Sequence, residues 1–142
     1  MKLTTAVIAL IATALTPSLA APTPNPSTKT LTKRFVPGAC GLHVTQHQKN
    51  EFGVGGDYQF DITIKDAAQA QIGGTSGLAI PDGQTRSVAS ELPATLDIGA
   101  GSVDQDAIRF AYAGHSWDTS SGQCSIGGYE NGKREGDCGF TC

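Results

Sequence analysis

Apolar and polar residues alternate along residues 58–65, so four apolar side chains fall on one face of an extended chain. This period of two predicts a half-buried β-strand. The same alternation returns at residues 108–113, and no long segment beyond the first 20 residues follows the 3.6-residue period of a helix. Shorter runs of strand-forming residues occupy 42–44, 78–80, 85–88 and 95–98.

Turn-forming residues separate these runs. Pro81-Asp82-Gly83 predicts a turn between the second and third short runs, 78–80 and 85–88. Asn131-Gly132 is the dipeptide most typical of a tight hairpin, and it lies between residues 124–126 and 138–140. With glycine at 18 positions, the chain is predicted to be all-β, a small antiparallel β-sandwich or barrel. Residues 66–71 could add a helical turn capped by Asp66.

The first 34 residues have the plan of a secretory leader followed by a pro-segment. Lys2 precedes an apolar stretch at 6–15, and small residues around Ala20 predict a signal peptide of residues 1–20 that is cut after Ala20. The stretch is shorter than a membrane-spanning helix. Residues 21–34 are rich in proline and hydroxyl side chains and end in Lys33-Arg34, a dibasic processing site. We therefore expect a secreted, extracellular product that consists of one domain, 35–142. The alternative is that residues 21–34 are not removed and remain on the mature protein as a flexible N-terminal tail.

Removal of this leader changes the net charge. The first 34 residues hold four of the ten cations and none of the 13 acids, so residues 35–142 carry a formal charge of −7. Nucleic acids and anionic membranes attract cationic proteins. We therefore expect neither as a partner, and we expect a monomer.

Cysteine usage agrees with an extracellular location. Four cysteines in a secretory chain of this size favour two disulfides over a metal site. Three pairings are possible. We prefer Cys40 with Cys142, which would tie the ends of the domain together, and Cys124 with Cys138, which would staple the terminal hairpin. The disulfides would stabilise the domain by about 4 to 5 and about 3 kcal/mol, respectively.

Candidate catalytic residues are His43, His47, His115 and Glu51, because a small hydrolase such as a ribonuclease can use two imidazoles, or one imidazole and a carboxylate. Their spacing does not select them: on a strand His43 and His47 would lie roughly 13 Å apart. No nucleophile elbow or zinc-protease helix motif is present. We therefore expect no enzyme activity, no metal and no cofactor, and regard the histidines as surface residues.

Two loops resemble ligand loops only superficially. Residues 99–106 contain Asp104 and Asp106 but lack the spacing of a standard calcium loop. We expect a surface turn there. The glycines at 53–56 precede a strand rather than a helix, so they are predicted to form a connection and not a phosphate cradle.

The most interesting surface is around the single tryptophan. Trp117 follows a strand that is already rich in aromatic residues, and with Tyr129 and Arg134 it would form a compact binding patch. The alternative for Trp117 is packing in the core, because indole rings are mostly buried.

The segment CSIGGYENGKREGDCGFTC at 124–142, together with the leader and its Lys33-Arg34 site, resembles small secreted cysteine-containing proteins of filamentous fungi, many of which are candidate effectors. This resemblance implies a role in virulence: export into the space around a host or competitor, persistence there through disulfides, and action by binding a target or by being perceived. It implies no catalytic residue. We expect an effector-like binding protein; the alternatives are a ribonuclease-like hydrolase and a cell-wall-associated or antimicrobial protein.

Overall fold

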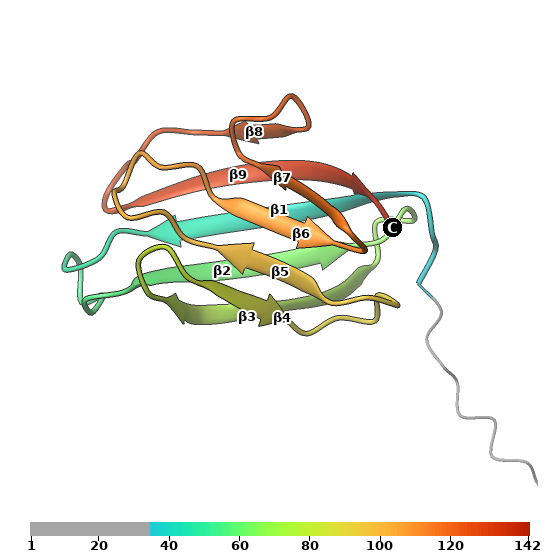
Figure 1. Cartoon of the computed structure of the whole chain (residues 1–142), viewed down its shortest axis with the longest axis horizontal. Helices are drawn as coiled ribbons and strands as arrows, with labels where there is room; N and C mark the ends of the chain where they lie inside the picture. Colours follow the sequence, from blue (N-terminus) through green and yellow to red (C-terminus); the bar gives the residue numbers. More distant parts are fainter. Residues whose placement is uncertain (1–34) are drawn as a thin grey trace, which may run out of the picture. The chain divides into compact units, whose positions relative to one another are not determined.

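The computed structural model describes residues 35–142, which form nine strands and no helix (Figure 1). The predicted signal peptide, the pro-segment, Ala20 and the Lys33-Arg34 site lie outside the described residues. The strands are β1 (Ala39–His47), β2 (Tyr58–Lys65), β3 (Gln71–Ile80), β4 (Thr85–Val88), β5 (Leu96–Gly99), β6 (Arg109–Tyr112), β7 (His115–Asp118), β8 (Cys124–Ile126) and β9 (Lys133–Thr141).

The strands make two antiparallel sheets. One has five strands in the order β3-β2-β1-β9-β8, and the other has four in the order β4-β5-β6-β7. Figure 1 shows the smaller sheet lying over the larger one. The predicted all-β fold, a small disulfide-stabilised antiparallel sandwich, is confirmed.

The alternation of buried and exposed residues along the strands shows which face of each sheet points into the core. In β2 each apolar residue of the period-two pattern is buried and the polar ones between are half-buried. β9 alternates without interruption between exposed and buried positions, although glycine and arginine stand at two of the buried ones. The inward side chains of both sheets form one hydrophobic core, to which Tyr58, Phe60 and Phe110 contribute large rings.

The predicted hairpin is present. β8 pairs with β9 in a register that places Cys124 opposite Cys138. Asn131 and Gly132 both have positive φ, 51° and 78°, as a type I′ turn requires. The turn at 81–84 is also confirmed, because Gln84 N donates to the Pro81 carbonyl at 3.0 Å and Gly83 has φ 70°.

The predicted helical turn at 66–71 is wrong. The Asp66 carboxylate accepts from the backbone N–H groups of Ala68 and Ala70, at 3.0 and 2.9 Å. A carboxylate that closes a local turn in this way competes with helix growth. The segment therefore turns back into β3, which begins at Gln71.

The two preferred disulfides are confirmed. Cys40 is bonded to Cys142 and Cys124 to Cys138, with Cα atoms 5.8 and 4.0 Å apart, and no cysteine among residues 35–142 is free. Backbone hydrogen bonds between Gly38 and Cys142 reinforce the first bridge. Disulfides of this kind fit an oxidising compartment. In the described part of the chain there is no helix long and apolar enough to cross a membrane.

The two edges of the sandwich differ. At the closed edge, where β3 meets β4, backbone hydrogen bonds join the sheets: Gly74 N to Ala89 O at 3.2 Å and Glu91 N to Ile72 O at 2.8 Å. At the open edge, where β7 faces β8 and β9, no backbone hydrogen bond within residues 35–142 links the sheets. Figure 1 shows the closed edge at the bottom and the open edge at the top.

Candidate functional site

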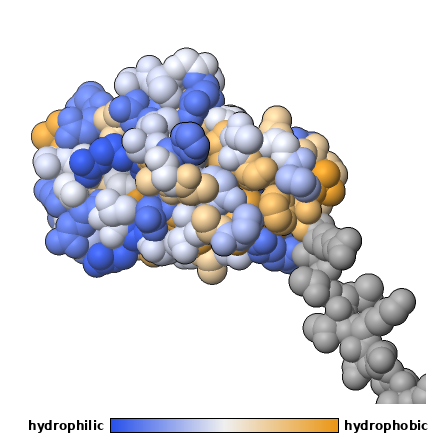
Figure 2. All heavy atoms as spheres, turned by 45° about the vertical axis from the view of Figure 1, so that its right-hand side comes forward, coloured by the Kyte–Doolittle hydropathy of each residue, from blue (hydrophilic) through white to orange (hydrophobic). Residues whose placement is uncertain are grey.

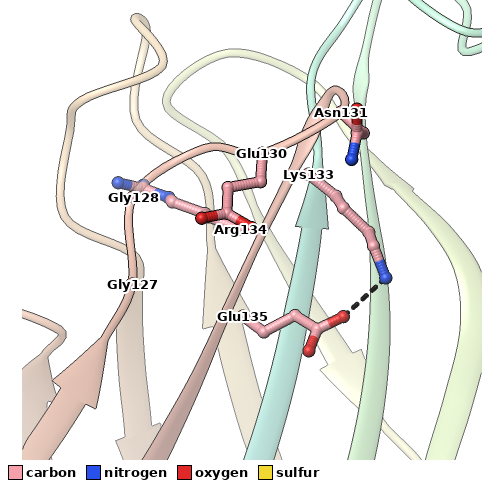
Figure 3. A pocket seen from close by; sticks show the side chains of 7 residues that line it. All are labelled: Gly127, Gly128, Glu130, Asn131, Lys133, Arg134 and Glu135. Atoms are coloured by element: carbon pink, nitrogen blue, oxygen red, sulfur yellow. Dashed lines mark hydrogen bonds and ion pairs between the residues drawn. The ribbon is translucent and has the colours of Figure 1, made fainter.

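A hollow lies at the tip of the β8–β9 hairpin (Figure 3). We call it the hairpin groove. It has a volume of about 370 Å³, and its wall is polar. Gly127, Gly128, Glu130, Asn131, Lys133, Arg134 and Glu135 line it. The disulfide between Cys124 and Cys138 fixes the base of the hairpin, so the groove is held in shape.

Arg134 fixes the position of the hairpin groove through hydrogen bonds to residues outside the hairpin. Its side chain is buried, and its Nε donates to Gln46 Oε1 at 2.8 Å while its guanidinium also donates to the Asp106 carbonyl. The guanidinium lies 5.0 Å from the centre of the Tyr129 ring, within cation–π distance. Arg134 therefore serves mainly to join the hairpin to β1 and to the loop after β5.

Tyr129 packs over this guanidinium. Its hydroxyl is buried and has no hydrogen-bond partner among residues 35–142. Burial raises the pKa of Tyr129 to about 12, although the positive charge of Arg134 acts in the opposite direction. The phenol therefore stays protonated and can donate a hydrogen bond.

The rim of the hairpin groove carries an exposed ion pair. Lys133 Nζ lies 2.7 Å from Glu135 Oε1, the contact drawn as a dashed line in Figure 3. The hydrogen bond from Lys133 lowers the pKa of Glu135, and the same bond raises the pKa of Lys133. Both side chains are about half exposed, so their charges are open to an incoming partner.

Phe52 is an exposed aromatic residue that the sequence reasoning missed. Its side chain is 77% exposed, in a loop that two internal backbone hydrogen bonds hold together. A Cβ on Gly132 would lie 2.2 Å from the Phe52 ring, so the ring packs against the hairpin turn. Figure 2 shows a mostly hydrophilic surface at the left-hand end of the molecule, interrupted by a small hydrophobic patch. A phenylalanine next to glycine in a turn-rich segment was the only available signal.

Lys49 attaches the Phe52 loop to its neighbours. Its Nζ contacts the Asp82 carboxylate at 2.6 Å and the Ser102 carbonyl at 3.1 Å. Val103, adjacent to Ser102, is 55% exposed. We use the name hairpin end for the hairpin groove together with Phe52 and Val103.

Trp117 lies elsewhere on the open edge. Its ring stacks on Phe110 and Phe140, with centroid distances of 5.7 and 5.4 Å. Phe140 is six residues from Arg134 along β9, roughly 20 Å for an extended strand. The structure therefore brings Tyr129 and Arg134 together and places Trp117 away from them, half-buried against the core.

The candidate catalytic residues are dispersed. His43 Nδ1 contacts Asp137 at 2.9 Å, and His47 Nε2 contacts Asp61 at 2.8 Å. His115 belongs to β7 in the other sheet, and Glu51 lies in the exposed Phe52 loop. No three His, Cys, Asp or Glu side chains within residues 35–142 form a group that could hold a metal ion.

The carboxylates of the 99–106 loop have separate structural partners. Asp106 accepts from the backbone N–H groups of Ser102 and Val103, and these bonds lower its pKa. Asp104 accepts from the Tyr58 hydroxyl at 2.8 Å and from Gln48 Nε2 at 2.7 Å. Burial and the bond to Asp104 raise the pKa of Tyr58. The two aspartates thus shape the loop instead of converging on one point.

These features define the class of the protein: a small, disulfide-stabilised, all-β sandwich with one hollow at the tip of the β8–β9 hairpin and another between β7 and β9. Comparison with protein-family models, curated proteins and solved structures found no match. The function must therefore be argued from the sites themselves.

Proposed function

We propose that this is a secreted, effector-like protein that binds a host or other extracellular macromolecule through its hairpin end. The observation that carries the proposal is the exposed Phe52 ring beside a preorganised hairpin groove. An aromatic side chain surrounded by polar groups is the usual composition of a binding hot spot. A groove held by a disulfide and a buried arginine loses little conformational entropy when a partner binds.

The chemistry of the groove indicates the kind of contact. Lys133 and Glu135 offer a donor and an acceptor at the rim. Phe52 adds apolar area next to these polar groups. Such a mixture suits a protein surface, where hydrogen bonds give specificity and one buried ring gives much of the affinity.

Secretion is supported by the leader pattern at 1–34 and by two disulfides in a domain of this size. The charge of −7 on residues 35–142 keeps such a domain soluble and discourages adsorption to anionic surfaces. The hydrolase alternative draws on histidines that each contact a different aspartate or lie in different sheets, so geometry gives it less support.

The test is infiltration of leaf tissue with protein secreted from the full-length chain, scored for cell death or suppressed defence. Phe52→Ser removes the exposed ring, and Val36→Ser is the matched control because Val36 is also an exposed apolar residue, 45% exposed. We expect the response to be lost with Phe52→Ser and kept with Val36→Ser. Equal responses from both variants would contradict a role for the hairpin end.

A variant with His43, His47 and His115 all replaced by alanine separates the alternatives. A binding protein keeps its response when these side chains are removed, whereas a histidine-dependent hydrolase loses it. No response to any form would reject the plant-effector proposal, and binding to chitin or glucan would then test the wall-associated alternative.

A further inference from the structure

The second hollow on the open edge has the character of a small-molecule site. It lies between β7 and β9 with a volume of about 240 Å³, and we call it the Trp117 hollow. Tyr112, Trp117 and Phe140 supply an aromatic wall, in which Phe140 lies 5.4 Å from each of the other two ring centres. Concave sites with apolar walls and a few polar groups are the usual form of ligand pockets.

The rim of the Trp117 hollow is formed by polar side chains that make no hydrogen bonds within residues 35–142. His115, Ser116, Gln123 and Thr141 line it, and none of their side chains makes a hydrogen bond within residues 35–142. Three of these side chains carry a hydroxyl or an amide, which can both donate and accept. They are therefore free to bond a ligand that presents several hydroxyl groups.

The hollow excludes charge. None of its lining residues is Asp, Glu, Lys or Arg. An ionised ligand would lose hydration here without gaining an ion pair. In addition, Trp117 Nε1 is buried and has no acceptor among residues 35–142.

Size limits the ligand further. Pockets for drug-sized molecules usually measure roughly 300 to 1,000 Å³, and this hollow is smaller. It suits one six-membered ring, with the rest of a chain left outside. A pyranose ring presents C–H bonds on its face, which pack on the negative face of an aromatic ring, and hydroxyls at its edge, which reach polar groups on the rim.

We propose that the Trp117 hollow binds one ring of an uncharged saccharide. Trp117, the most exposed of the three rings, receives the ring face, while Ser116 and Gln123 bond its hydroxyls. This site lies roughly 20 Å along β9 from Arg134 and the hairpin groove. The proposal therefore stands independently of macromolecular binding at the hairpin end.

Trp117 itself reports on binding, because it is the single tryptophan of the chain. Secreted protein is titrated with N-acetylglucosamine oligomers and with β-glucan oligomers while tryptophan emission is followed. A galacturonic acid oligomer tests charge, and cyclohexanol tests an apolar ring with a single hydroxyl. We expect a saturable emission change with a neutral oligomer and none with the two comparators.

Matched variants locate the binding. Ser116→Ala with Gln123→Ala removes two exposed rim groups, and we expect affinity to fall roughly tenfold. Ser125→Ala with Gln105→Ala changes the same residue types at exposed positions outside the hollow and should leave affinity unchanged. Circular dichroism checks that both proteins are folded.

Three outcomes would overturn the proposal. They are the lack of a saturable change with every neutral oligomer, equal or tighter binding of either comparator, and equal affinity of the two double variants. The Phe52→Ser protein should bind the oligomer normally, so failure of the hairpin-end proposal would not be mistaken for failure of this one.

Discussion

The two edges of the sandwich differ in how the two sheets are joined. At the closed edge, the glycines of β3 allow the backbones of the two sheets to approach, and a Cβ on Gly73 would lie only 2.4 Å from Ser90 Cβ. At the open edge, no backbone hydrogen bond within residues 35–142 links the sheets, and the rings of Trp117 and Phe140 meet across the gap instead. The two sheets are thus joined by backbone contact on one side and by side-chain packing on the other. The closed edge carries a hollow of its own, of about 380 Å³, which is lined by residues between 87 and 95.

The disulfides carry the largest expected effect on stability. Replacing Cys40 and Cys142 with serine opens a loop of 102 residues and should lower the free energy of unfolding by about 4 to 5 kcal/mol. Replacing Cys124 and Cys138 opens a loop of 14 and should cost about 3 kcal/mol. Urea unfolding measures both values. An equal or larger loss for the hairpin bridge would contradict the view that it mainly shapes the open edge.

Replacement of Arg134 is expected to give the next largest loss of stability. Arg134→Met removes the partner of the buried Gln46 amide oxygen and of the Asp106 carbonyl, and should destabilise the protein by about 2 kcal/mol. Arg86→Met is the control, because Arg86 is exposed and, within residues 35–142, its side chain hydrogen-bonds the adjacent Thr85 carbonyl alone. Equal unfolding midpoints for the two variants would show that the buried guanidinium does not hold the hairpin.

The closed edge is tested by adding one methyl group. Gly73→Ala places a Cβ against Ser90 and the Ala89 carbonyl and should cost about 1.5 kcal/mol. Gly139→Ala in β9 adds the same group where nothing lies within 4 Å, so thermal unfolding should change little. If both variants unfold at the same temperature, close backbone approach is not what seals this edge.

A smaller, pH-dependent effect comes from Asp61 in β2. Burial alone would raise the pKa of Asp61, but hydrogen bonds from Ser76, His47 and the Gly77 N–H outweigh it and lower the pKa below its ordinary 3.8. The unfolded chain therefore binds the proton first as the pH falls. The stabilising contribution is complete at pH values well above 3.8 and is lost as the pH falls through the folded-state pKa.

Melting temperatures between pH 7 and pH 2.5 measure this contribution. The difference between the parent protein and Asp61→Asn should be largest near neutral pH and should shrink in acid. A difference in melting temperature that stays constant between pH 7 and pH 2.5 would contradict a lowered pKa for Asp61 in the folded protein.

The sequence predicted those features that depend on local pattern. The alternation at 58–65 matched β2, Asn131-Gly132 marked the hairpin turn, and loop length favoured the two observed disulfides. These signals suffice because strand period, turn conformation and loop closure are properties of neighbouring residues or of spacing along the chain.

Features that depend on contacts between distant segments could not be predicted. The first seven of the ten residues of β3 read Gln-Ile-Gly-Gly-Thr-Ser-Gly, without a strand period, and they become a strand because β2 pairs with them. The bond from Arg134 to Gln46 spans 88 residues. Phe52 had only a neighbouring glycine and a turn-rich segment to mark it, and its position beside Gly132 exists only once β1 and β9 have paired.

Hydrogen–deuterium exchange of the secreted protein, read strand by strand, tests the difference between the two edges most directly. The account predicts slow exchange at Gly74 and Glu91, whose N–H groups join the sheets at the closed edge, and faster exchange along β7 and β8. Equal protection at both edges, or greater protection of β7 and β8, would contradict it.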